Sequence, residues 1–105
     1  MKLFAKEVKK IVVNNYEFLC VIDQRPVKDF ISFKIYPSET KTTYFLILFS
    51  WEINWATNLC QPMVCAKLIQ HAISSGWNYN IKHAVFKLQN GDDLIGQLGL
   101  DQLNW

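Results

Sequence analysis

The chain has 105 residues; 50% are hydrophobic, 19% are charged, and the formal net charge at pH 7 is +2. This length is typical of a single domain over residues 1–105 that buries a core of its own, and the composition excludes an intrinsically disordered chain. A net charge this small does not by itself indicate a nucleic-acid-binding protein.

The first seven residues contain neither the apolar core nor the cleavage site of a signal peptide. The most apolar run, residues 44–51, is far shorter than the roughly 20 residues that a membrane-spanning helix requires. The three cysteines, Cys20, Cys60 and Cys65, are an odd number. We therefore expect reduced, buried cysteines and a cytoplasmic location.

The N-terminal third predicts three strands. Residues 9–13 are β-branched, and Asn14-Asn15 suits a two-residue hairpin turn because asparagine tolerates a positive φ. The turn leads into a second strand over residues 16–23. A third strand is predicted over residues 29–36, with one apolar and one mixed face.

A fourth strand, predicted over residues 42–50, is apolar on both faces. Alternation places three large side chains on each face: Phe45, Ile47 and Phe49 on one, and Tyr44, Leu46 and Leu48 on the other. A strand of this kind belongs in the middle of a sheet that is covered on both sides. The next segment contains Trp51 and Trp55, whose spacing fits either a continued strand or one helical turn, and the pattern does not decide between them.

A helix is predicted to begin at Pro62, since proline is favoured in the first turn, and to end before Gly76. Gln61, or as the alternative Asn58, occupies the capping position. The apolar residues of this segment recur at helical spacing: Val64, Cys65, Leu68, Ile69, Ala72 and Ile73.

After the helix, residues 81–88 predict a returning strand and Asn90-Gly91 predicts a turn. Residues 93–95 suit a further short strand, and the last residues form a tail. The predicted fold is α+β: an antiparallel β-meander of four to five strands with one helix packed on one face.

No motif indicates an enzyme. Cys65 and His71 are six residues apart and fall on different faces of the helix, and a pairing of Cys20 with His83 would depend on a chance register of two strands. Cys60 and Cys65 have no second ligand pair that would complete a zinc site. We therefore predict no catalytic residues, no metal and no cofactor.

The mismatch between one helix and a two-faced apolar sheet predicts a binding surface. A single helix covers one face, and soluble monomers rarely leave a large apolar patch exposed. The cover is a second copy of the chain, a different protein, or the chain's own tail from Leu94 to Trp105. The candidate interface residues come from the second face and from the ends of the helix: Tyr44, Leu46, Leu48, Phe30, Tyr36, Trp51, Trp55, Trp77 and Tyr79. For Trp77 we also expect a packing role, as a clamp between the helix and the strand that follows.

The alternative is a single-stranded nucleic-acid-binding module, in which exposed aromatic residues stack on bases and lysines meet phosphates. The lysines considered are Lys34, Lys82 and Lys87, but the small basic excess of the chain disfavours this alternative.

Pro62, the run "LIQHAISSGW" and the strand "HAVFKL" resemble a pattern in small bacterial α+β proteins of uncharacterised function, some carried on mobile gene cassettes or beside toxin genes. The resemblance covers about residues 11 to 88 and departs at Asn78, near which those proteins have a proline. It implies the fold and a bacterial cytoplasm, and supplies no catalytic residues. We expect a small protein-interaction module that binds through the second apolar face, as a homodimer or as an immunity-like or accessory factor, with no membrane partner.

Overall fold

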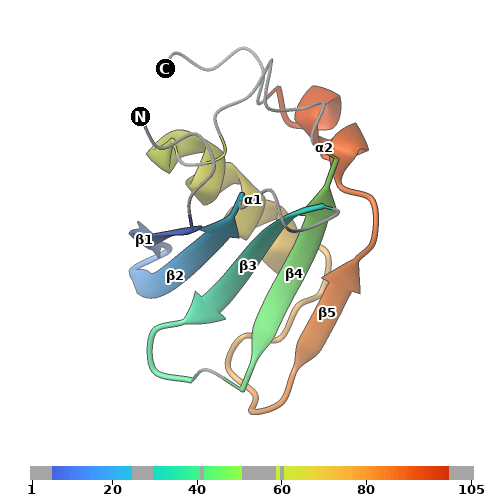
Figure 1. Ribbon diagram of the computed structural model, residues 1–105. Coiled ribbons are helices and arrows are strands. Elements are labelled where there is room, and N and C mark those ends of the chain that lie inside the picture. Colours follow the sequence, from blue (N-terminus) through green and yellow to red (C-terminus); the bar gives the residue numbers. More distant parts are fainter. Residues whose placement is uncertain (1–5, 25–29, 41, 51–58, 60, 100–105) are drawn as a thin grey trace.

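The computed structural model describes residues 6–24, 30–40, 42–50, 59 and 61–99. It is an α+β fold with five strands and two helices (Figure 1). In chain order the elements are β1 (Lys6–Val13), β2 (Tyr16–Asp23), β3 (Ile31–Pro37), β4 (Tyr44–Phe49), α1 (Pro62–Ser74), β5 (Val85–Leu88) and α2 (Asp92–Gln97). The five strands form one sheet in the order β1-β2-β3-β4-β5. The α+β class and the antiparallel meander of the first four strands are therefore confirmed.

The turn between β1 and β2 is the one that the sequence predicts. Asn14 and Asn15 have φ values of 55° and 63°, in the left-handed region that asparagine adopts more readily than most residues. The turn sets the register of the hairpin, in which Val13 pairs with Tyr16 and Val8 with Val21.

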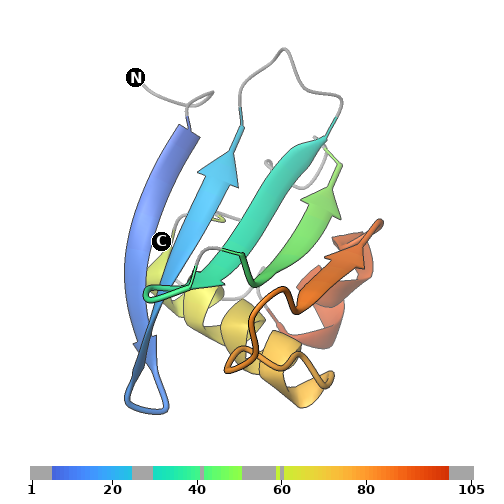
Figure 2. The same cartoon turned by 90° about the horizontal axis from the view of Figure 1, so that it is seen from below.

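Both helices lie on the same side of the sheet, as the view from below shows (Figure 2). We call the side that they cover the inner face and the opposite side the outer face. The inner face carries the core, to which β2, β3 and β4 contribute alternate residues. These strand residues are fully or almost fully buried: Phe18, Cys20, Ile22, Ile31, Phe33, Ile35, Phe45, Ile47 and Phe49.

Helix α1 has the limits and the buried stripe that its sequence predicts. Gln61 is the N-cap, and its side-chain Oε1 accepts a hydrogen bond from the Met63 amide at 3.0 Å. Gly76 follows the helix with a φ of 101°, a conformation that glycine adopts at little cost. The buried residues of α1 are Val64, Cys65, Leu68, Ile69 and Ala72.

Two predictions about the fifth strand are wrong. The fifth strand is parallel to β4, not antiparallel, because α1 carries the chain back to the same end of the sheet before β5 begins. It starts at Val85 instead of residue 81, because Ile81 forms a turn with Asn78 and His83 has a φ of 62°, which does not fit a strand.

The prediction of a single helix is also corrected. Residues 93–95, expected to be a strand, lie within α2. Asn90 Oδ1 accepts from the Asp92 amide at 3.1 Å, and Asp92 and Asp93 in the first turn suit the positive end of a helix dipole. Leu94 and Ile95 are buried in the core, so α2 packs on the inner face that α1 already covers.

The two helices have 13 and 6 residues. Within the described residues, neither is long and apolar enough to cross a bilayer.

Candidate functional site

The outer face of the sheet is the candidate site. The strand register places two rows of side chains across all five strands on this face. One row consists of Val8, Val21, Lys34, Leu46 and Lys87. The other consists of Lys10, Leu19, Tyr36, Tyr44 and Val85.

Neither described helix covers these rows, and Figure 1 shows the outer face turned toward the viewer with α1 behind the sheet. The apolar residues on the three inner strands are half-buried: Leu19, Val21, Leu46 and Leu48. Those at the margins of the face are exposed: Val8, Val12, Val85 and Phe30. The outer face is therefore a mainly apolar surface that spans the whole width of the sheet.

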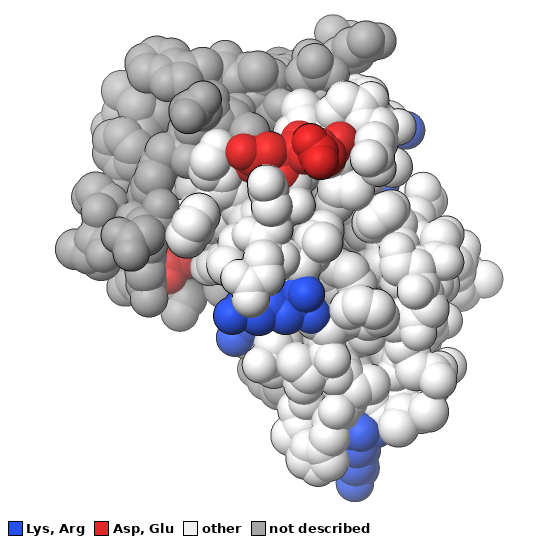
Figure 3. Space-filling model, turned by 90° about the vertical axis from the view of Figure 1, so that its right-hand side faces the viewer, with Lys and Arg blue, Asp and Glu red and all other residues white. Residues whose placement is uncertain are grey.

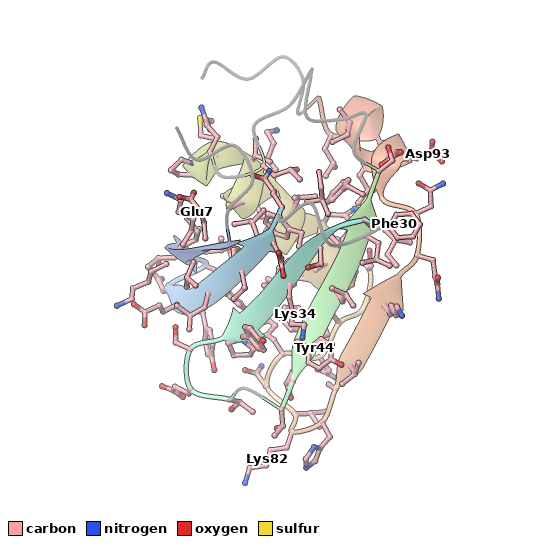
Figure 4. The ribbon with its side chains drawn as sticks, viewed as in Figure 1. Glu7, Phe30, Lys34, Tyr44, Lys82 and Asp93 are labelled. Atoms are coloured by element: carbon pink, nitrogen blue, oxygen red, sulfur yellow. The ribbon has the colours of Figure 1, made fainter. Side chains whose placement is uncertain are left out.

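Lys34 lies near the middle of this surface, beside Tyr44 (Figure 4). Its Nζ is 4.5 Å from the centroid of the Tyr44 ring and 5.7 Å from that of Tyr36. The two rings contact each other edge to face, with centroids 6.1 Å apart. This cation–π arrangement holds a positive charge at the centre of the apolar surface.

The other charges of the outer face are near its margins. Lys10 Nζ forms an ion pair with Glu17 Oε2 at 3.8 Å, which reduces the net charge of that corner. Lys87 is exposed at the opposite margin, on β5. Asp23, which the register also places on the outer face opposite Ser32, is almost fully buried at the end of β2. The positive charge of the middle and of the β5 side comes from Lys34 and Lys87.

The structure brings together five of the predicted interface residues and places two others, Trp77 and Tyr79, elsewhere. Tyr44, Leu46, Leu48 and Tyr36 lie on the outer face, and Phe30 lies at its upper end (Figure 4). Trp51 and Trp55 lie outside the described residues.

The remaining two, Trp77 and Tyr79, pack on the inner side of the sheet. Trp77 is only 3% exposed, and its ring contacts those of Phe18, Phe45 and Tyr79. Its Nε1 donates to the Ala84 carbonyl at 3.0 Å, and its backbone amide donates to the Ala72 carbonyl at 3.2 Å. Trp77 thus connects the end of α1 to the residue before β5, which is the clamp that the sequence predicts.

Sequence reasoning missed the contribution of both edge strands to the outer face. Val8 and Val12 on β1 and Val85 on β5 extend the surface beyond the predicted set. The alternation of Val8, Lys10 and Val12 could have indicated that this strand contributes apolar residues to the outer face. The predicted strand, however, began at Lys9 and excluded Val8.

Cys20 and Cys65, the two cysteines that the structure describes, supply no comparable site. Cys20 on β2 and Cys65 on α1 are both fully buried, and the two thiols interact with each other. The interaction with Cys65, together with burial, raises the pKa of the Cys20 thiol far above its usual range, while the interaction with Cys20 lowers the pKa of Cys65 against the effect of burial. Cys65 Sγ also lies 3.4 Å from the Leu59 carbonyl oxygen, which it can bond as a donor. A thiol pair sealed in the core packs the sheet against the helix and offers no substrate an approach.

The two histidines lie apart from these thiols. His71 interacts with Ser75 one turn further along the chain, at the end of α1, and His83 is exposed in the loop before β5. Across residues 6–24, 30–40, 42–50, 59 and 61–99, no three His, Cys, Asp or Glu side chains gather as metal ligands would.

Comparisons of the chain with protein-family models, with curated proteins and with solved structures found no match.

Proposed function

We propose that this chain is a protein-interaction module that binds another protein through the outer face of its sheet. The observation that carries the proposal is the position of α2. Both described helices cover the inner face, so the apolar outer face is left without a cover from either of them. Burial of apolar surface contributes roughly 25 cal/mol per Å², so a surface of this kind favours association.

The charges of the face suggest the chemistry of the partner. Apolar side chains of a partner would pack against the apolar residues of the face, which are Leu19, Val21, Leu46 and Leu48. A carboxylate of the partner would pair with Lys34 or Lys87. The tyrosine rings around Lys34 supply rigid contact area of the type that is enriched at interfaces. The partner is therefore a protein surface with an apolar centre and at least one Asp or Glu.

The nucleic-acid alternative has less support. Base stacking requires free aromatic faces, but the Lys34 ammonium already lies over the rings of Tyr36 and Tyr44. The Trp77 ring is buried in the core and cannot stack on a base. The accessory or immunity-like role and the bacterial cytoplasm rest on the sequence resemblance and form part of the same proposal.

The test places a photo-crosslinking amino acid at position 46, and in a matched control at position 70. Leu46 lies on the outer face, and Gln70 is exposed on α1 on the opposite side of the molecule. A partner that uses the outer face should crosslink at position 46 and not at position 70.

The affinity of the captured partner, once purified, is then measured for Leu46→Glu and Gln70→Glu. We expect Leu46→Glu to weaken binding by about 30-fold or more, as loss of a central apolar contact does, and Gln70→Glu to leave it unchanged. Equal affinities for the two variants would contradict the proposal. Salt-dependent binding to a mixed oligonucleotide that is lost in Tyr44→Ala would support the nucleic-acid alternative instead.

A further inference from the structure

Strand β5 ends the sheet and has a free edge that points away from β4. The Ala84 carbonyl accepts from the Tyr44 amide, and the Ala84 amide donates to Thr43 Oγ1, so the backbone of Ala84 faces β4. Because backbone groups alternate along a strand, Phe86 also faces β4, whereas Val85 and Lys87 direct their N–H and C=O groups to the free edge. These groups have no strand partner within the described residues.

The side chains around this edge are unusually apolar for an exposed strand. Ile81 is 54% exposed, Val85 52% and Phe86 43%. Figure 3, which views the molecule from this side, shows a broad uncharged surface interrupted by few charges. Natural edge strands are commonly protected by charged residues or by a cover, and an uncovered apolar edge is a template for pairing with another strand.

The charges near the edge have opposite signs at its two ends. Asp92 and Asp93 begin α2, just beyond the upper end of β5, and Lys82 precedes the lower end (Figures 3 and 4). A two-fold axis perpendicular to the sheet, placed beside the middle of β5 on its free-edge side, relates two copies so that opposite ends of their β5 strands meet. It would bring Lys82 of each copy toward Asp92 and Asp93 of the other.

We propose that a second copy of this chain pairs with the free edge of β5, antiparallel and two-fold symmetric, so that the five-stranded sheet is doubled. With Phe86 opposite its counterpart, Val85 of one copy faces Lys87 of the other, and all the outward backbone groups of both residues find partners. The two Phe86 rings form a cross-strand pair on the inner face. In this register neither Lys87 faces the other directly.

The opposite edge of the sheet does not suit self-pairing. β1 carries Lys6, Lys9 and Lys10 against a single acidic residue, Glu7. Lysines on an edge strand oppose pairing with another strand, and a second copy of β1 would add like charges.

This self-association uses the backbone edge of β5, whereas the proposed partner surface is the outer face, and the two share only the residues Val85 and Lys87. A two-fold axis perpendicular to the sheet keeps both outer faces on the same side. Each copy in the dimer therefore still presents its outer face to a partner.

Sedimentation equilibrium of the full chain tests the proposal. The wild type should show twice the monomer mass of 12.3 kDa. Val85→Pro removes an outward N–H at the first residue of an edge strand, where proline is tolerated, and should weaken the dimer about 30-fold or more. Val85→Ala keeps that N–H and should weaken it much less. A monomeric wild type, or a dimer equally stable in both variants, would overturn the proposal. Thermal unfolding followed by circular dichroism checks that each variant is folded.

Charge reversal provides the second test. Lys82→Asp and Asp93→Lys each place like charges across the two-fold axis, and each should weaken the dimer about tenfold. A mixture of the two variants should form the heterodimer, since the introduced aspartate then meets the introduced lysine, and the unchanged Lys82 of one copy meets the unchanged Asp93 of the other. Failure of the mixture to associate would count against this edge.

A dimer that is lost in Leu46→Glu but unaffected by Val85→Pro would instead assign self-association to the outer face.

Discussion

At the scale of single residues, Gly91 shows how a turn signal in the sequence can hide a packing requirement. The Asn90-Gly91 pair predicted a turn, and the chain does turn there before α2. Gly91 has an ordinary φ of −94°, so its backbone conformation does not require glycine. Its amide donates to the Leu48 carbonyl at 2.8 Å, and this close approach to β4 leaves no room for a side chain.

We expect Gly91→Ala to lower the free energy of unfolding by about 1–3 kcal/mol, as overpacking does. The added Cβ would collide with Ile47 Cγ2 and lie 3.0 Å from Phe49 Cε1, both in the core. Urea unfolding measures the change. Gly96→Ala is the matched control: Gly96 is exposed in α2 with open space around it, and alanine should stabilise that helix by about 0.5–1 kcal/mol. Equal effects of the two substitutions would contradict the packing argument.

At the scale of elements, the two helices differ in how visible they are in the sequence. Helix α1 has a proline in its first turn, a cap, a buried stripe at helical spacing and a glycine after its end. Helix α2 has only 6 residues, too few for a helical period to repeat, and contains Gly96. Its formation depends on the burial of Leu94 and Ile95 against the sheet, which no local pattern encodes.

The cap of α1 gives a prediction at this scale. Gln61→Ala removes the acceptor for the Met63 amide and should lower the free energy of unfolding by about 1 kcal/mol in urea titrations. Gln70→Ala, at an exposed position inside the same helix, should change it by no more than about 0.5 kcal/mol. An effect of Gln70→Ala as large as that of Gln61→Ala would argue that helix propensity, not capping, determines the stability of α1.

At the scale of the whole molecule, the sheet has two unequal apolar faces. Adjacent residues of β4 alternate between a sealed core on the inner face and the half-buried outer face. The two helices account for the burial of the inner face, and this asymmetry underlies the proposed partner surface.

Adjacent substitutions on β4 should therefore differ sharply in their effect on folding. Ile47→Ser places a hydroxyl at a fully buried position and removes core contacts, so it should cost about 4 kcal/mol or more. Leu46→Ser, at a half-buried position on the outer face, should cost only about 1 kcal/mol. Thermal and urea unfolding of both variants measure the difference. Comparable losses would mean that the outer face is as closely packed as the core.

Much of this architecture follows from local pattern. Asn14-Asn15 predicted the first turn, the patterns of residues 16–23 and 29–36 predicted β2 and β3, and Pro62 and Gly76 marked the limits of α1. The predicted interface was less accurate, because sequence alternation does not show which aromatic residues fold back onto the core. Trp77 is a core residue and the partly buried Tyr79 packs against the core, whereas Val8 and Val85 lie on the outer face.

The sequence by itself determined the class of the fold, the meander of the first four strands and the position of α1, because hydrophobic period, turn residues and caps act over a few neighbouring residues. Only the tertiary structure decided that α2 shares the inner face with α1, that β5 runs parallel to β4, and that the free edge of β5 has opposite charges at its two ends. Those features depend on contacts between segments far apart in the chain, whose free energies are summed only when the whole molecule packs.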